Sequence, residues 1–119
     1  MEANELRIGN LVEYLGEFKE VLGMDEETVF LKNTVSVNYL ELEEILPISL
    51  TEELLLSFGF KKYKDNYGSY YIKQSRTVKI RKKGIDRYRY EHSRLDIKYV
   101  HQLQNLYFAI TETELIFKS

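Results

Sequence analysis

IKYVHQLQNLYFAI, residues 97–110, is the stretch of this chain that most constrains its fold. At 100° per residue its larger apolar side chains fall within one narrow stripe, namely Tyr99, Leu103, Leu106 and Ile110. Such a stripe predicts an amphipathic helix whose apolar face covers a core. Ser93 and Asp96 have the spacing of a capping box before it, and Asp96 is an alternative cap. Phe108 interrupts the polar face of this helix.

The composition is that of an ordinary soluble domain. With 119 residues, of which 44% are hydrophobic and 30% charged, the chain can bury a core without a disulfide or a metal. Cysteine is absent, which excludes disulfides, thiolate metal sites and cysteine catalysis and fits a reducing compartment. No apolar run approaches the roughly 18 residues of a membrane span. The acidic start MEANELRIGN does not have the pattern of a signal peptide. The expected location is therefore cytoplasmic.

The net charge of −2 conceals a strong asymmetry along the chain. Residues 1–60 contain three Lys or Arg and thirteen Asp or Glu, a net charge of −10. Residues 61–98 contain thirteen Lys or Arg and four Asp or Glu, a net charge of +9. Opposite charges in two parts of one chain indicate a binding surface, mutual compensation within or between subunits, or a charge distribution that serves solubility alone.

Residues 1–48 predict a small, strongly bent β unit, for which an SH3-like barrel is one candidate form. Short runs with strand patterns recur at intervals of about ten residues. They lie at residues 11–14, 18–22, 28–32 and 34–39. Residues 42–46 then predict a single helical turn before Pro47, the only proline.

Residues 49–119 predict a short helix, an antiparallel sheet and the long helix packed on it. The short helix spans residues 52–58, because Thr51 is a good N-cap and Gly59 can adopt the left-handed conformation that ends a helix. Strand patterns follow at residues 60–64, 69–73, 77–81 and 87–90. Their alternation is typical of a sheet with one packed face. The predicted fold class is α+β, with subdomains 1–48 and 49–119 forming a single compact unit.

Three stretches of the sequence carry a resemblance. They are NELRIGN at residues 4–10, PISLTEE with FGF at residues 47–53 and 58–60, and YVHQLQNLYFA at residues 99–109. They resemble a set of small proteins of Bacteroides-type bacteria and of their phages and integrated elements, for which no activity is known. The resemblance leaves out the basic stretch, assigns no catalytic residue and implies an accessory protein of the cytoplasm. Those proteins have a glycine after the threonine that follows the last helix, whereas this chain has Glu112, so a glycine-type helix stop is not expected here.

The basic stretch 61–98 is the strongest sequence indication of a ligand, because it contains six of the ten tyrosines. Cations can neutralise phosphates while tyrosine rings stack on exposed bases, so the stretch suggests a nucleic-acid face. The candidate residues are Lys79, Arg81, Arg87, Arg89, Tyr70 and Tyr88. The alternative is that tyrosine simply favours strands and that the cations are the solvated side of the sheet or balance the acidic half. No RNP-like or helix-turn-helix sequence is present.

A second candidate surface is the polar face of the 97–110 helix. An aromatic side chain ringed by polar groups is typical of a docking patch, and Phe108 has His101, Gln104 and Asn105 around it. The alternative is that the N-terminal β unit covers this face and buries Phe108. The function expected first is a non-catalytic cytoplasmic binding protein with an unknown protein partner, or a homodimer. Nucleic-acid binding through residues 61–98 is the alternative.

Catalytic and metal-binding patterns are weak. His92 and His101 are the only histidines, and neither belongs to a local metal-ligand motif. Ser93, His92 and Asp96 are close in sequence but lack a nucleophile turn, and the glycines are too dispersed to form a phosphate loop. No cofactor, metal or membrane partner is therefore expected, and an enzyme is not the favoured class.

Overall fold

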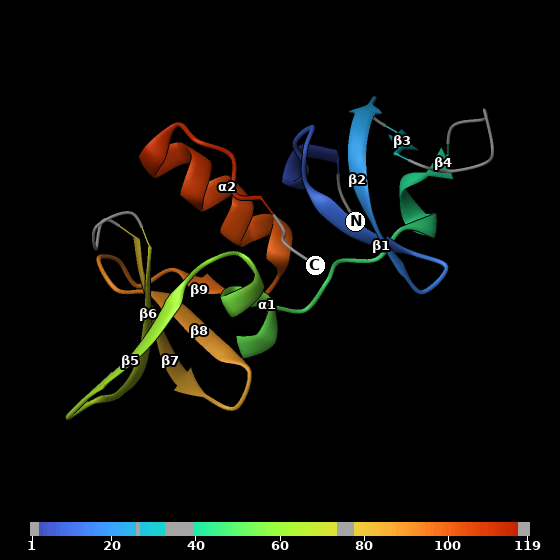
Figure 1. The fold of residues 1–119 in the computed structure, drawn as a ribbon. Coiled ribbons are helices and arrows are strands. Elements are labelled where there is room, and N and C mark those ends of the chain that lie inside the picture. The colour runs from blue at the N-terminus through green and yellow to red at the C-terminus, as the bar shows by residue number, and fades with distance from the viewer. Residues whose placement is uncertain (1–2, 26, 33–39, 74–77, 117–119) are drawn as a thin grey trace. The chain divides into compact units, whose positions relative to one another are not determined.

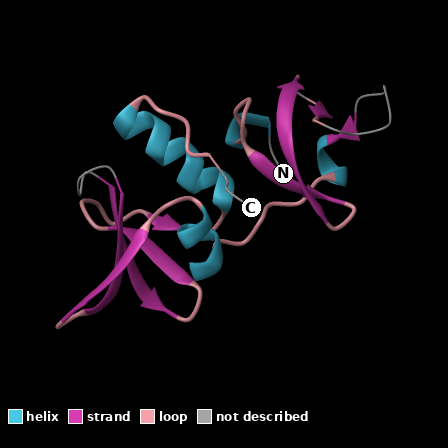
Figure 2. Ribbon diagram, in the orientation of Figure 1, coloured by secondary structure: helices cyan, strands magenta, loops and turns pink. Residues whose placement is uncertain are grey.

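The structure is a computed structural model that describes residues 3–25, 27–32, 40–73 and 78–116 (Figure 1). It confirms the α+β class, with two antiparallel sheets and α-helices (Figure 2). The chain divides into two units. Unit 1 comprises Met1–Ile48 and Tyr99–Asn105, and unit 2 comprises Ser49–Lys98 and Leu106–Ser119. No helix in the described ranges combines the length and apolar character that a membrane crossing requires.

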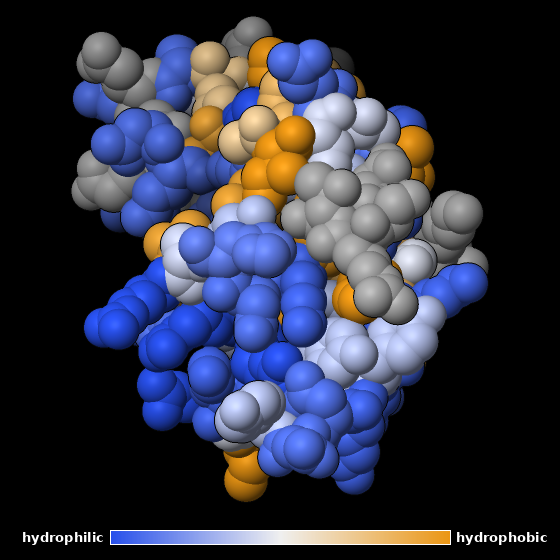
Figure 3. Space-filling view, turned by 90° about the vertical axis from the view of Figure 1, so that its left-hand side faces the viewer, coloured by the Kyte–Doolittle hydropathy of each residue, from blue (hydrophilic) through white to orange (hydrophobic). Residues whose placement is uncertain are grey.

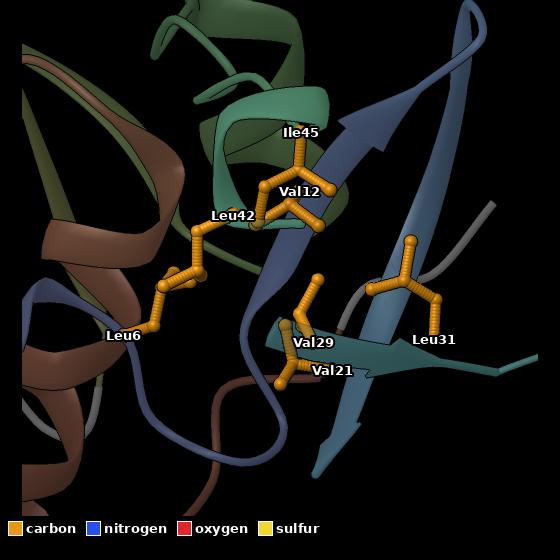
Figure 4. Packing of buried hydrophobic residues seen from close by; sticks show 7 residues of the cluster. All are labelled: Leu6, Val12, Val21, Val29, Leu31, Leu42 and Ile45. Atoms are coloured by element: carbon orange, nitrogen blue, oxygen red, sulfur yellow. The ribbon is translucent and has the colours of Figure 1, made fainter. Parts of the chain in front are cut away.

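Unit 1 is built on a sheet with the strand order β1-β2-β3-β4. Its elements are η1 (Ala3–Glu5), β1 (Leu11–Tyr14), β2 (Glu17–Met24), β3 (Thr28–Leu31), β4 (Leu40–Glu41) and the 3-10 turn η2 (Leu42–Glu44). The strands predicted at 11–14, 18–22 and 28–32 and the turn within 42–46 are confirmed, whereas the strand predicted at 34–39 lies outside the described residues. The core is a cluster of aliphatic side chains (Figure 4), consisting of Leu6, Val12, Val21, Val29, Leu31, Leu42 and Ile45.

The β1–β2 hairpin has a two-residue loop with unusual chemistry. Tyr14 pairs with Glu17, which leaves Leu15 and Gly16 as the loop, with φ of 50° and 78°. Two positive φ values in a two-residue loop favour Asn-Gly, because a side chain such as leucine is strained in the left-handed region. Leu15 is nevertheless 84% exposed and therefore gains little from burial.

Unit 2 contains a five-stranded antiparallel sheet with the order β5-β6-β7-β8-β9. The strands are β5 (Lys61–Asp65), β6 (Gly68–Lys73), β7 (Val78–Gly84), β8 (Arg87–Tyr90) and β9 (Asp96–Ile97). Helix α1 (Glu52–Ser57) precedes them. Its predicted signals are confirmed, because the Thr51 hydroxyl oxygen accepts from the Leu54 amide at 3.3 Å and Gly59 has φ of 93°.

Helix α2 (Val100–Thr111) begins later than predicted. Ile97 belongs to β9, and Asp96 pairs with Arg89 across the sheet, so the predicted capping box at Ser93 and Asp96 is wrong. Pairing with β8 overrides the local capping preference of these residues. At the other end, Glu112 adopts φ of 57° and its amide donates to the Phe108 carbonyl at 2.8 Å. The helix therefore ends in a left-handed residue although no glycine is present.

One face of the five-stranded sheet is the core of unit 2. Its buried side chains are Tyr71, Val78, Ile80, Tyr88 and Ile97. Helix α1 is tied to this face by Glu52, which accepts from the Tyr71 hydroxyl at 2.7 Å and pairs with Lys62 at 2.6 Å. From α2, the buried Tyr107 packs edge-on against Phe60 with ring centroids 6.3 Å apart. The opposite face of the sheet carries the charged side chains considered next.

Candidate nucleic-acid interface

The strand register places one row of long side chains across the whole sheet of unit 2. Tyr63 pairs with Tyr70, Tyr70 with Arg81, Arg81 with Arg89, and Arg89 with Asp96. Directly opposed residues share a face, and so do residues two apart along a strand. The row and its neighbours define what we call the outer face. Its other members are Lys61, Asp65, Ile72, Lys79, Arg87 and Glu91.

A pair of stacked tyrosines occupies one end of the outer face. The rings of Tyr63 and Tyr70 are nearly parallel, with centroids 5.7 Å apart and 19° between their planes. The Lys79 ammonium lies 4.4 Å from the Tyr70 centroid and the Arg81 guanidinium lies 5.0 Å from it. Tyr63 belongs to β5, the edge strand, and remains 46% exposed. This end of the face thus presents an aromatic ring beside a cation.

Arg81 is a structural residue rather than a solvated cation. Its side chain is only 4% exposed. Two of its nitrogens donate to the two Asp65 oxygens at 2.7 and 2.9 Å, and Nε donates to Glu91 at 3.0 Å. Longer contacts of 3.5 Å reach Glu91 and the Gly68 carbonyl. These five contacts use all five N–H groups of the guanidinium. The prediction that Arg81 presents its charge to a ligand is therefore wrong, because the carboxylates of Asp65, at the end of β5, and of Glu91, just after β8, enclose it.

The carboxylates around Arg81 are held in their charged form. Hydrogen bonds from Arg81 lower the pKa of Asp65 to about 2, and the nearby charge of Lys79 acts in the same direction. Hydrogen bonds from Arg81 also lower the pKa of Glu91, with Lys79 and Lys83 contributing. The two carboxylates are consequently committed to Arg81 and sit in a positive local potential.

The rest of the outer face retains a net positive charge. Arg89 pairs with Asp96 at 3.0 Å, and this pair is partly exposed. Counting the whole face, five cations stand against three carboxylates, a net charge of +2. Lys61, Lys79 and Arg87 form no ion pair with the described residues. Figure 3 shows that hydrophilic residues, in blue, dominate the lower part of this view, where the strands of unit 2 lie.

Tyr88 does not belong to this surface. It is buried and sits on the core face, where its ring packs edge-on against Tyr71 at 6.1 Å. The alternation of β8 puts Tyr88 opposite to Arg87 and Arg89, so its assignment to the candidate face is wrong. Tyr63 was missing from the predicted nucleic-acid face. It could have been included, because it lies in the predicted strand next to that of Tyr70 and two residues before Asp65, on the same face of that strand. Only the register shows that its ring stacks on Tyr70.

The predicted docking patch on α2 is largely buried. Gln104 and His101 are each only 2% exposed, whereas Phe108 is 37% exposed. In unit 1, the Gln104 side chain accepts from the Leu11 amide at 2.8 Å and from Asn10 at 3.4 Å, and it donates to the Gly9 carbonyl at 3.4 Å. The expectation that His101 and Gln104 are exposed is therefore wrong, and polar groups of the N-terminal segment enclose the Gln104 side chain.

Asn105 completes this amide cluster. Its carbonyl oxygen accepts from Asn10 at 2.8 Å and from Arg7 at 3.2 Å, and its amide donates to the Glu5 carbonyl at 3.2 Å. Asn10 is fully buried. These hydrogen bonds join residues that are 95 to 100 positions apart in the sequence. No local sequence pattern reveals such pairs. The cluster fixes backbone groups of the N-terminal segment instead of presenting a surface.

His101 is the exception among these polar residues. It stacks on Tyr99 at 5.7 Å, and its buried Nδ1 has no hydrogen-bond partner among the described residues. Burial lowers the pKa of His101, and the nearby charge of Glu5 opposes this shift. The described residues contain no group of three or more His, Asp or Glu that could hold a metal ion.

Comparisons with models of protein families, with curated proteins and with solved structures yield no match to this chain. The resemblance to small proteins of Bacteroides-type bacteria thus stays a prediction.

Proposed function

We propose that this chain is a non-catalytic binding protein of the cytoplasm and that the outer face of unit 2 binds single-stranded nucleic acid. The observation that carries the proposal is the stacked Tyr63–Tyr70 pair with Lys79 beside it. Proteins that bind single strands combine aromatic rings, on which bases stack, with cations that follow the phosphates. Tyr63 supplies the exposed ring, and Lys61, Lys79 and Arg87 supply the cations.

The arrangement of charge favours a single strand over a folded protein partner. The carboxylates of the outer face are bound by Arg81 and Arg89, so they are not available to pair with cations of a partner. A ring at a sheet edge also requires bases that are free to leave their own stack, which a duplex does not offer. Protein docking through α2, the function expected first from the sequence, loses its basis because His101 and Gln104 are buried.

The proposal is tested by the anisotropy of labelled single-stranded oligonucleotides of DNA and RNA. The wild-type chain is expected to bind at low salt, with an affinity that falls as salt rises, by about 0.7 logarithmic units per phosphate contact for each tenfold increase. Tyr63→Ala should weaken binding by roughly 1–3 kcal/mol, the usual contribution of one stacked base. A duplex of the same sequence should bind more weakly.

Lys79→Gln and Lys64→Gln form a matched pair of variants. Both remove one positive charge, but Lys79 lies on the outer face, whereas the alternation of β5 points Lys64 to the other side. Only Lys79→Gln should reduce affinity clearly and lower the salt dependence. Equal effects of the two variants would indicate binding by overall charge alone, and no shift in anisotropy at low salt would refute the proposal.

A further inference from the structure

The hairpin of unit 1 exposes an apolar surface next to carboxylates. Glu13 pairs with Phe18 in β2 on one side and with Leu46 on the other, where two backbone hydrogen bonds of 2.9 Å join Glu13 and Leu46. Opposed residues share a face, so Phe18 and Leu46 flank Glu13. Both apolar side chains are about half exposed. Leu15 lies in the loop, beyond the next pair, Tyr14–Glu17.

Leu15 gives independent support to a binding role for this surface. An exposed leucine with φ of 50° is strained, and asparagine would fit the same loop with less strain. Leu15 therefore weakens the fold without contributing to the core. Strain of this kind is a recognised feature of binding sites. We call Glu13, Leu15, Phe18 and Leu46 the hairpin patch.

Unit 2 carries a protrusion of complementary character. The β7–β8 turn reads Lys82-Lys83-Gly84-Ile85-Asp86-Arg87, and Ile85 at its tip is 90% exposed. Three cations and one carboxylate surround this isoleucine in the sequence. Lys83 and Arg87 have no ion-pair partner among the described residues. The turn therefore presents one exposed apolar side chain with cationic residues next to it in the sequence.

We propose that the hairpin patch binds the β7–β8 turn of a second copy of this chain. Ile85 would pack against Leu15, Phe18 and Leu46, while Lys83 approaches Glu13. The net charges of the two units agree with this pairing, since unit 1 is strongly acidic and unit 2 strongly basic. Because two different surfaces meet, the contact is head-to-tail, and each dimer keeps one unused surface of each kind.

The proposal is tested by sedimentation velocity of the full chain over a range of concentrations and salt. The wild type should self-associate at low salt and less at high salt, because screening weakens the contribution of the charges. Leu15→Asn should lower the association constant by about tenfold or more, the effect of losing a central apolar contact. The same variant should raise the melting temperature, because it relieves the strained loop. Lost association therefore cannot be attributed to unfolding.

A mixing experiment identifies the partner surface. Ile85→Ser should weaken self-association as Leu15→Asn does, but an equimolar mixture of the two variants should form a 1:1 complex with nearly wild-type affinity. In that mixture, one chain supplies an intact patch and the other an intact turn. Leu56→Ser, at an exposed leucine of α1, is the control and should change nothing.

Three outcomes would overturn the proposal. They are a wild-type chain that stays monomeric at low salt, an Ile85→Ser variant that associates like the wild type, and a mixture that does not associate. None of the three bears on the nucleic-acid proposal, because that test uses Tyr63, Lys79 and Lys64. Conversely, a failure to bind oligonucleotides leaves the self-association prediction intact.

Discussion

Each unit of this protein encloses a polar centre, and the two centres use different chemistry. In unit 1, neutral amides of Asn10, Gln104 and Asn105 satisfy one another and nearby backbone groups. In unit 2, the charged Arg81 is enclosed by two carboxylates that remain about one third exposed. Both centres looked like surface residues in the sequence. The difference is that the amide centre depends on complete hydrogen bonding, whereas the ionic centre depends on charge balance.

The largest expected effect comes from breaking the ionic centre. Arg81→Met should destabilise unit 2 by about 2–3 kcal/mol, somewhat less than for a fully buried pair because Asp65 and Glu91 keep access to water. Arg89→Met, in the next strand of the same row, should cost at most about 1 kcal/mol, since its pair with Asp96 is exposed. Amide hydrogen exchange in β6 to β8 measures the stability of unit 2 in both variants. Similar losses of stability in the two variants would contradict the structural role of Arg81.

The amide centre should respond less strongly. Gln104→Leu retains the volume but leaves the Leu11 amide and the Gly9 carbonyl without their partner, at an expected cost of about 1–2 kcal/mol. Denaturation followed by circular dichroism measures the loss. Gln102→Leu, at an exposed position of the same helix, removes a hydrogen bond that the side chain accepts from the Tyr99 amide at 3.1 Å in contact with water, and it should cost less. If the two variants were equally stable, the buried hydrogen bonds of Gln104 would contribute little.

Acid should destabilise the two units at different pH values. The pKa of His101 is lowered by burial, so the folded state favours neutral His101, and the resulting stability is lost as pH falls below about 6.5 and through the lowered value. The pKa of Asp65 is lowered to about 2, so its contribution is present above about pH 4 and is lost only toward pH 2. Unit 1 should thus lose amide protection at milder acid than unit 2.

His101→Phe keeps a ring to stack on Tyr99 and cannot titrate. This variant should reduce the loss of unit 1 stability that begins as pH falls below about 6.5. His92→Phe, at an exposed position beside Tyr90, is the matched control and should leave the pH profile unchanged. If the profile survived in His101→Phe, another group would be responsible for it.

The smallest expected effect is a gain in stability at the end of α2. Glu112 occupies the left-handed position with φ of 57°, where glycine lacks the clash of a Cβ atom. Glu112→Gly should therefore stabilise the protein by about 0.5–1 kcal/mol. The thermal midpoint measures this gain, and a loss would mean that the Glu112 side chain contributes more than its backbone strain costs.

Local sequence patterns predicted most of the secondary structure. Thr51 and Gly59 bounded α1 because capping and left-handed backbone are properties of single residues and their nearest neighbours. β9 was missed because two residues carry no periodicity, and the start of α2 was misplaced because Asp96 pairs with β8. The candidate face was predicted in part. Alternation placed Lys79 and Arg81 together, but it could not show which cation is neutralised.

The sequence by itself determined which residues alternate, where α1 begins and ends, and how charge is distributed along the chain, because these depend on neighbours in the chain. The tertiary structure decided which polar side chains are buried. Arg81 meets Asp65 and Glu91 only through the register of β5 to β8, and Gln104 meets Leu11 across 93 positions. Burial of a polar group depends on whether distant partners satisfy its hydrogen bonds, and those partners are set by packing rather than by periodicity.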